Sequence, residues 1–138
     1  MAGELQRVVL MADDDTEDCM LATEAFAGSG AKAAFSCVLE GVELMNHLTE
    51  NSRSEAKRLL DLILLDLNMP RKDGREALVE IKAEPALQHI PSVILTASKE
   101  EKDIALTMKA GAESCITKPV TFDEWVEMMK SLAESWLR

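Results

Sequence analysis

The fold is decided by the stretch Leu62-Ile63-Leu64-Leu65-Asp66, which is followed by Leu67-Asn68-Met69-Pro70. Four apolar residues in a row predict a strand that is buried on both faces, as the central strands of parallel sheets are. Ligands bind beyond the carboxyl ends of the strands in open α/β sheets. Because Asp66 ends this strand, we expect its carboxylate at a ligand-binding edge.

On both sides of that central strand in the sequence, strand and helix signals alternate, five of each along the chain. We expect strands over residues 7–12, 34–38, 61–66, 92–96 and 114–117, and helices over residues 15–27, 41–51, 74–83, 99–110 and 121–137. Such an alternation favours a parallel sheet with helices on both faces and right-handed crossovers. The predicted fold class is therefore α/β, a doubly wound (βα)5 arrangement around a five-stranded parallel sheet.

The last expected helix has the clearest pattern. Thr121 followed by Glu124 predicts a capping box at its start. The apolar residues of this helix recur at steps of three and four, which predicts one buried face. They are Phe122, Trp125, Val126, Met129, Leu132, Ala133 and Trp136.

Length and composition limit the class of protein. The 138 residues and the hydrophobic content of 47% predict one globular domain over residues 1–138, without an effector domain. The net charge of −10 argues against nucleic acid as a partner. No apolar run approaches the ~20 residues of a membrane span, and no signal peptide is visible at the N-terminus. We therefore expect a cytoplasmic protein without a membrane partner.

The cysteines bear on the redox environment. Cys19, Cys37 and Cys115 are odd in number and lack the spacing of metal ligands. We expect them to be reduced thiols that are mostly packed, as is usual for cytosolic proteins.

Polar residues follow several of the expected strands at one edge of the predicted sheet. Asp13 and Asp14 follow the first strand, Thr96 ends the fourth, and Lys118 follows the fifth. Taken alone, two adjacent acids before a helix are equally well explained as helix caps. Beside Asp66, however, they form a cluster of carboxylates that repel one another unless some are protonated or a cation joins them.

Mg²⁺ is the cation that suits such a cluster. It takes oxygen ligands, keeps several waters and bridges carboxylates to a phosphate. The expected ligands are the side chains of Asp13, Asp14 and Asp66 and the backbone carbonyl of Asn68. The sequence therefore predicts a magnesium site at the carboxyl edge of the sheet.

Phosphoryl chemistry follows from this arrangement. Asp66 would be the nucleophile that forms an aspartyl phosphate. Mg²⁺ and the amine of Lys118 would stabilise the charge on the phosphoryl oxygens, and Thr96 would offer its hydroxyl to one of them. Pro119 fixes the place of Lys118 at the sheet edge. The turn at Lys118-Pro119 is also consistent with a cis peptide bond.

Taken together, the motifs resemble the receiver domain of bacterial two-component response regulators. They are Asp13-Asp14, Leu64-Leu65-Asp66-Leu67-Asn68-Met69-Pro70 through Asp73-Gly74, Leu95-Thr96-Ala97 and Lys118-Pro119. The resemblance covers roughly residues 6–134, the expected core of the receiver domain. It implies a flavodoxin-like fold with strand order 2-1-3-4-5, Mg²⁺ binding, and phosphorylation of Asp66 by a histidine kinase or phosphotransfer protein. It also implies a stand-alone switch rather than an enzyme, a phosphoacceptor that assists its own phosphorylation and dephosphorylation and signals to a downstream protein target.

A narrower resemblance is carried by further stretches of the chain. Arg71-Lys72-Asp73-Gly74-Arg75-Glu76-Ala77-Leu78, Ile81-Lys82-Ala83-Glu84-Pro85, His89-Ile90-Pro91 and Ala133-Glu134-Ser135-Trp136-Leu137 are similar to single-domain regulators of the cyanobacterial phytochrome type. That subfamily implies a homodimer through the fourth and fifth helices. One position departs from the receiver pattern. Cys115 stands where receivers often carry the Tyr or Phe whose rotation reports phosphorylation, and we expect it to be a small packed residue.

Two other functions compete with this interpretation. A phosphohydrolase with an aspartyl nucleophile needs an acid/base Asp two residues after the nucleophile, where this chain has Asn68. A degenerate receiver could act as a phosphorylation-independent binding module, but the complete set of site residues argues against it. Mg²⁺-dependent labelling of Asp66 by a small phosphodonor separates the three functions.

Overall fold

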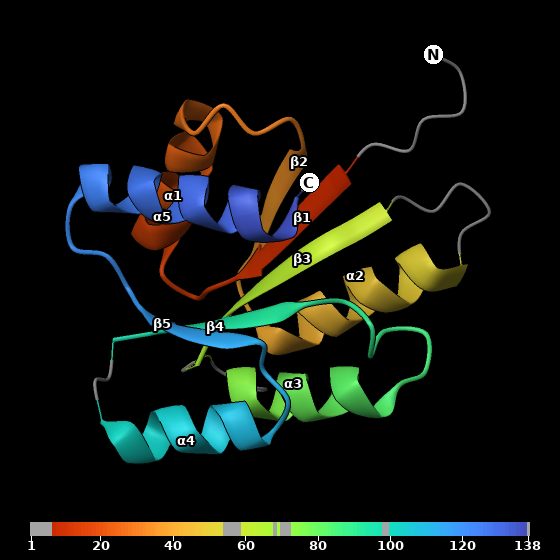
Figure 1. Cartoon of the computed structure of the whole chain (residues 1–138). Helices are drawn as coiled ribbons and strands as arrows, with labels where there is room; N and C mark the ends of the chain where they lie inside the picture. Colours follow the sequence, from red (N-terminus) through yellow and green to blue (C-terminus); the bar gives the residue numbers. More distant parts are fainter. Residues whose placement is uncertain (1–6, 54–58, 68, 70–72, 98–99, 138) are drawn as a thin grey trace.

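The computed structural model describes residues 7–53, 59–67, 69, 73–97 and 100–137. Within them, five strands and five helices alternate along the chain (Figure 1). They are β1 (Arg7–Ala12), α1 (Thr16–Gly28), β2 (Ala34–Val38), α2 (Gly41–Arg53), β3 (Leu59–Asp66), α3 (Gly74–Ala83), β4 (Ser92–Thr96), α4 (Glu101–Lys109), β5 (Ser114–Thr117) and α5 (Phe122–Trp136). The predicted alternation of strands and helices is confirmed.

The five strands form one parallel sheet in the order β2-β1-β3-β4-β5. Figure 1 shows α1 and α5 over one face of this sheet and α2, α3 and α4 over the other. This is the predicted doubly wound, flavodoxin-like fold with the predicted strand order. Because β1 and β3 are neighbours in the sheet, their carboxyl ends lie side by side at the edge where such folds bind ligands.

The central strand β3 separates two hydrophobic cores, as its apolar run predicts. Ile63 and Leu65 pack into the core with residues of α2 and α3, whereas Leu62 and Leu64 pack into the core with residues of α1 and α5. All four residues are at most 1% exposed. Burying each of these side chains contributes about 2 kcal/mol. Packing from both sides therefore holds β3, and Asp66 at its end, in place.

Side chains cap the starts of α1 and α5. Thr121 caps α5, as predicted, by accepting from the N–H of Glu124. The cap of α1 is Asp15, which accepts from the N–H groups of Glu17 and Asp18, rather than Asp13 or Asp14. The prediction that Phe122 belongs to the buried face of the last helix is wrong, because this residue is 42% exposed. Phe122 is the first residue of α5, and packing against the sheet begins one turn later at Trp125. None of the helices in the described part of the chain is long and apolar enough to cross a membrane.

The expectation of three reduced thiols is wrong for two of the cysteines. Cys19 of α1 and Cys37 of β2 form a disulfide, with their Cα atoms 6.0 Å apart. The fold brings these residues together across a separation of 18 residues, so no short spacing motif in the sequence predicts the disulfide. Cys115 is a free thiol and packs, partly buried, against the core on the α2 and α3 side of the sheet.

Reduction of the Cys19–Cys37 disulfide should lower the free energy of unfolding by about 3 kcal/mol. The unfolded chain then regains the closure entropy of a loop with a sequence separation of 18 residues. Urea denaturation with and without a thiol reductant measures the difference. The double variant Cys19→Ala with Cys37→Ala is the control, because its stability should not respond to the reductant. Equal stability of the oxidised and reduced parent protein would contradict this prediction.

Candidate functional site

The predicted site residues lie together at the carboxyl edge of the sheet. Asp13 follows β1, Asp66 ends β3, Thr96 ends β4 and Lys118 follows β5. Carboxylate oxygens of Asp13, Asp14 and Asp66 all lie within 4.8 Å of one another. The sheet therefore gathers the acids, the hydroxyl residue and the amine that the sequence places at the ends of separate strands.

The loop after β1 divides its two acids between the interior and the surface. Asp13 is fully buried, whereas Asp14 is exposed. The N–H of Asp13 donates to the carbonyl oxygen of Val38 at 3.0 Å, and Oδ1 of Asp13 accepts from the N–H of Asp15 at 2.9 Å. These two bonds fix the backbone and the carboxylate of Asp13, and they leave Oδ2 to face Lys118.

Asp66 is held by the segment that follows it. Its side chain is 6% exposed. The N–H of Leu67 donates to the carbonyl oxygen of Leu95 at 3.1 Å, and the N–H of Gly74 donates to the carbonyl oxygen of Leu67 at 3.0 Å. Gly74 thereby comes so close to the backbone of Asp66 that an added Cβ would overlap the Asp66 carbonyl oxygen. Space, rather than backbone conformation, requires glycine at this position.

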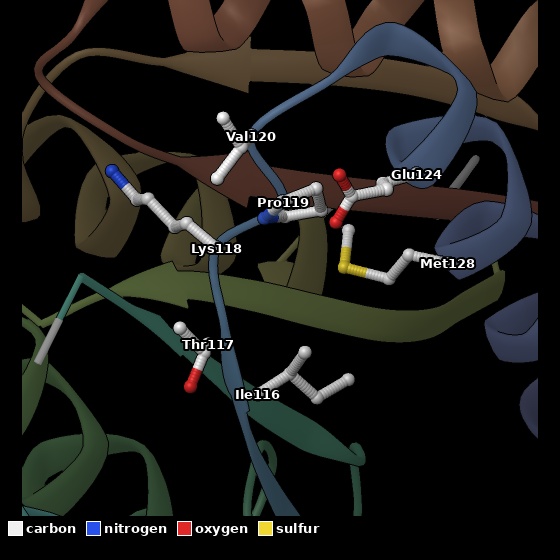
Figure 2. A pocket seen from close by; sticks show the side chains of 7 residues that line it. All are labelled: Ile116, Thr117, Lys118, Pro119, Val120, Glu124 and Met128. Carbon is white, nitrogen blue, oxygen red and sulfur yellow. The ribbon is translucent and has the colours of Figure 1, made fainter. Parts of the chain in front are cut away.

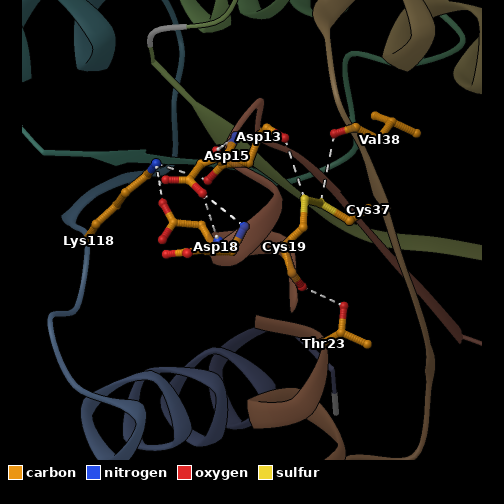
Figure 3. Close-up of a disulfide and its surroundings, with 9 residues drawn as sticks. Asp13, Asp15, Asp18, Cys19, Thr23, Cys37, Val38 and Lys118 are labelled. Atoms are coloured by element: carbon orange, nitrogen blue, oxygen red, sulfur yellow. Dashed lines mark hydrogen bonds and ion pairs between the residues drawn. A yellow bond between two sulfur atoms is a disulfide. The ribbon is translucent and has the colours of Figure 1, made fainter. Parts of the chain in front are cut away.

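The amine of Lys118 joins the acids. Its Nζ atom lies 2.9 Å from Oδ2 of Asp13, 2.9 Å from Oδ2 of Asp18 and 3.4 Å from Oδ1 of Asp66. Figure 3 shows the side chain of Lys118 reaching Asp13 and Asp18 from the segment that follows β5. One ammonium group thus neutralises part of the charge of three carboxylates that come from different elements.

Asp18 is a site residue that the sequence reasoning missed. It lies in the first turn of α1, where an acidic residue is most simply explained by the helix dipole. In the structure its Oδ2 atom accepts a hydrogen bond from the amine of Lys118. Its position in that first turn, five residues after Asp13, is the only signal in the sequence. The partner Lys118 is 100 residues away in the chain.

The Lys118–Pro119 peptide bond is trans, so the expectation of a cis bond is wrong. The N–H of Lys118 donates to the carbonyl oxygen of Thr96 at 2.8 Å and so continues the pairing of β4 with β5 by one residue. Bonds before proline favour the trans form by about 0.5–1 kcal/mol. Because the amine already reaches the acids from this extended backbone, the turn has no need of the cis form.

Burial and charge shift the pKa values of the two central groups. Burial raises the pKa of Asp13 above its usual value, against the lowering effects of the Asp15 N–H and of Lys118. Burial alone would lower the pKa of Lys118. The hydrogen bonds to Asp18 and Asp13 and the charges of Asp13 and Asp66 outweigh this and raise it well above the usual lysine value. The lysine is therefore charged at neutral pH, and Asp13 keeps its proton to a higher pH than a free aspartate does.

The residues present fit a hard divalent cation. Carboxylates of Asp13, Asp18 and Asp66 lie within 3.4 Å of the Lys118 ammonium group, and the carboxylate of Asp14 lies within 4.8 Å of those of Asp13 and Asp66. Oδ2 of Asp13 is buried and accepts no hydrogen bond of good geometry from the described residues; the amine of Lys118 approaches it as an ion pair. Oxygen donors and excess negative charge suit Mg²⁺ or a similar ion. The backbone carbonyl of Asn68, also predicted as a ligand, lies outside the described residues.

A pocket of about 480 Å³ lies on the α5 side of Lys118, away from the acids. Figure 2 shows the amine of Lys118 extending away from Glu124 and Met128, which line the pocket from α5. Val120 lines the same pocket and is 87% exposed. Lys118 therefore stands between the acidic cluster and a partly apolar surface.

Known proteins similar to this chain point to one family. The family model for the response regulator receiver domain matches residues 9–130. Response regulator Rcp1 from Synechocystis sp. is 33% identical over 131 residues, which cover 95% of this chain and 89% of that protein.

Solved structures show the same similarity. The crystal structure of the phosphorylated cyanobacterial phytochrome response regulator RcpA superposes with a TM-score of 0.84 at 36% identity, over 96% of this chain and 94% of that chain. The Mn²⁺-bound form of response regulator Rcp1 superposes with a TM-score of 0.79 at 32% identity, over 92% and 91% of the two chains. The predicted resemblance to single-domain regulators of the cyanobacterial phytochrome type is confirmed.

Gly74→Ala should destabilise the fold by about 1–3 kcal/mol, because the added methyl group forces the Asp66 backbone to move. Gly28→Ala is the matched control. A Cβ at Gly28 meets nothing within 4 Å, and alanine is the better helix former, so its stability should equal or exceed that of the parent. Urea denaturation of the two variants measures the effect. A Gly74→Ala protein as stable as the parent would disprove the close approach.

Proposed function

The chain belongs to the response regulator receiver domain family, and on this premise we propose that Asp66 accepts a phosphoryl group and thereby switches a protein-binding surface. Receiver domains are signalling domains of two-component systems, and they interact with a kinase or another phosphodonor. The observation that carries the proposal for this chain is the position of Asp66. It is a 5%-exposed carboxylate at the end of the central strand, inside an acidic cluster and 3.4 Å from a lysine.

The proposed reaction is an in-line transfer from a phosphohistidine donor. A carboxylate oxygen of Asp66 forms the new bond to phosphorus as the phosphorus–nitrogen bond of the donor breaks. The nitrogen leaves with its electron pair and returns to neutral imidazole. The burial of Asp66 restricts water, which protects the acyl phosphate that results.

Lys118 and Thr96 complete the acceptor. The amine of Lys118 exchanges a carboxylate partner for a phosphoryl oxygen, and the hydroxyl of the buried Thr96 donates to another. The backbone bond from Lys118 to Thr96 ties the ends of β4 and β5 together. Movement of either side chain toward the phosphoryl group is therefore transmitted to the segments that follow both strands, which is the switching step.

We assign Mg²⁺ to the acidic cluster, held by Asp13, Asp14 and Asp66, with Asn68 as a further ligand through its backbone carbonyl. The excess of carboxylates over ammonium groups and the burial of Asp13 support this assignment. Mg²⁺ supplies positive charge that stabilises the transferring phosphoryl oxygens. We propose that the phosphoryl donor is a histidine kinase or phosphotransfer protein of the cytoplasm. We propose that the phosphorylated chain then binds a downstream protein target.

Asp66→Asn should fold and take up no phosphoryl group, because an amide is a poor nucleophile. Acetyl phosphate with Mg²⁺ serves as the donor, and mass spectrometry of the intact protein and its peptides locates the label. Asp61→Asn is the control, since Asp61 lies at the opposite end of the same strand and should leave labelling unchanged. A label on any residue other than Asp66 would refute the assignment.

Mg²⁺ affinity should fall as the pH decreases, and the fall should begin above the usual pKa range of an aspartate. Burial raises the pKa of Asp13, and the cation needs the ionised carboxylate, so protons compete with it from a higher pH than usual. Titration calorimetry at a series of pH values measures this. Asp14→Asn should bind Mg²⁺ more weakly but keep the shifted pH profile, because Asp14 is exposed. A profile with the pKa of a free aspartate in the parent protein would contradict the role of Asp13.

We further propose that the switched protein-binding surface forms a homodimer through α4 and α5. Four large apolar residues on this side of the molecule are at least 39% exposed, which favours a covering partner. They are Leu106, Met108, Val120 and Phe122. Met128 of α5 does not belong to this surface, because it is buried in the core on the α1 and α5 side.

Val120→Glu should convert the dimer to a monomer, because it places a charge at the centre of the proposed apolar contact. Val79→Glu is the matched control, since Val79 is also exposed but lies on α3. Sedimentation equilibrium of the parent and both variants measures the oligomeric state. A monomeric parent protein at high concentration would remove the dimer from the proposal and leave the phosphoacceptor intact.

A further inference from the structure

The disulfide between Cys19 and Cys37 lies beside the acidic cluster, and the phosphoryl transfer proposed above does not use it. Cys19 belongs to the start of α1, and Cys37 is the last residue but one of β2. Figure 3 shows the bond beside Asp13, on the side away from Lys118. It therefore connects two elements that meet at the candidate metal site.

Both half-cystines contact the residues that hold the site. Sγ of Cys19 lies 3.4 Å from the carbonyl oxygen of Asp13, and Cys19 directly follows Asp18. On the other strand, Val38 follows Cys37 and accepts the backbone hydrogen bond of Asp13. Asp13 is thus held from both sides by segments that the disulfide joins to each other.

The bond is open to exchange from one side. Cys19 is buried, whereas Cys37 is half-buried and lies on β2, an edge strand of the sheet. Cys37 is therefore the more accessible of the two residues, and we expect an attacking thiol to meet its sulfur first and release Cys19 as the leaving thiol. Disulfides in a reducing compartment are usually transient and redox-sensing rather than structural. A pair that is reachable and in contact with a functional loop fits that class.

We propose that Cys19 and Cys37 form a reversible redox modification site whose oxidation tightens Mg²⁺ binding at the acidic cluster. The proposal rests on the metal site of the proposed function. Oxidised glutathione, or another small disulfide, is the oxidant. Its sulfur–sulfur bond breaks as the Cys19–Cys37 bond forms, and the two electrons and two protons of the protein thiols leave on two molecules of the reduced thiol.

The direction of the effect follows from preorganisation. The closed disulfide keeps the start of α1 and the end of β2 from moving apart, so the carboxylate of Asp13 is already in place before the ion arrives. The reduced protein must order these segments on binding, which costs affinity. We expect the oxidised form to bind Mg²⁺ about tenfold more tightly than the reduced form. Tenfold is the low end of the loss in metal affinity that follows when the residues supporting metal ligands are changed.

Linkage provides a test that does not depend on phosphorylation. If Mg²⁺ prefers the oxidised form tenfold, saturating Mg²⁺ lowers the midpoint potential of the Cys19–Cys37 pair by about 30 mV. The full chain carrying Cys115→Ala is equilibrated in glutathione buffers with and without Mg²⁺. Thiols are then alkylated and counted by mass spectrometry. The double variant Asp13→Asn with Asp14→Asn should show the same midpoint potential with and without Mg²⁺.

A second variant separates affinity from redox chemistry. Cys37→Ser cannot form the bond, and by calorimetry it should bind Mg²⁺ as weakly as the reduced parent protein does. Equal midpoints with and without Mg²⁺, or a higher midpoint with Mg²⁺, would overturn the redox proposal. If both redox forms still bind Mg²⁺ and Asp66 is still labelled, the proposed function stands without it. Absence of Mg²⁺ binding in both forms would overturn the redox proposal and the metal assignment together.

Discussion

The ammonium group of Lys118 is the charge on which the whole site depends. It lies 2.9 Å from carboxylate oxygens of Asp13 and Asp18 and 3.4 Å from one of Asp66, so it serves acids from three separate elements. Without it, these carboxylates would repel one another at the point where β1 and β3 pair most closely. The carboxylates in turn raise the pKa of the lysine, so this cation stays charged at neutral pH.

This shared lysine also explains how a buried acidic cluster can be both stable and reactive. The three carboxylates of Asp13, Asp18 and Asp66 share one ammonium group, so the cluster carries excess negative charge. In the proposed function, a metal ion would add positive charge without displacing the lysine from every partner. The lysine would then exchange one carboxylate for a phosphoryl oxygen and keep the others.

The sequence predicts most of the fold and the main residues of the site for a clear reason. Strands and helices are predicted from local signals, such as the apolar run before Asp66 and the cap at Thr121. The parallel sheet then brings the polar residues at the ends of separate strands to one edge. The missed features are contacts between distant residues that carry no pattern of their own. Asp18 meets Lys118 across 100 residues, and Cys19 meets Cys37 only because α1 and β2 are neighbours. The trans bond before Pro119 and the exposure of Phe122 depend on how each segment meets the sheet.

The strand order has a consequence for how this protein is made. Asp13 and Asp66 come from β1 and β3, which are paired in the sheet, whereas their lysine follows β5, the last strand in the sequence. On the ribosome, the first three strands emerge long before residue 118, so the growing chain holds the clustered acids without their internal cation. During that interval the acids that follow β1 and end β3 lack the lysine whose charge offsets their repulsion in the finished fold.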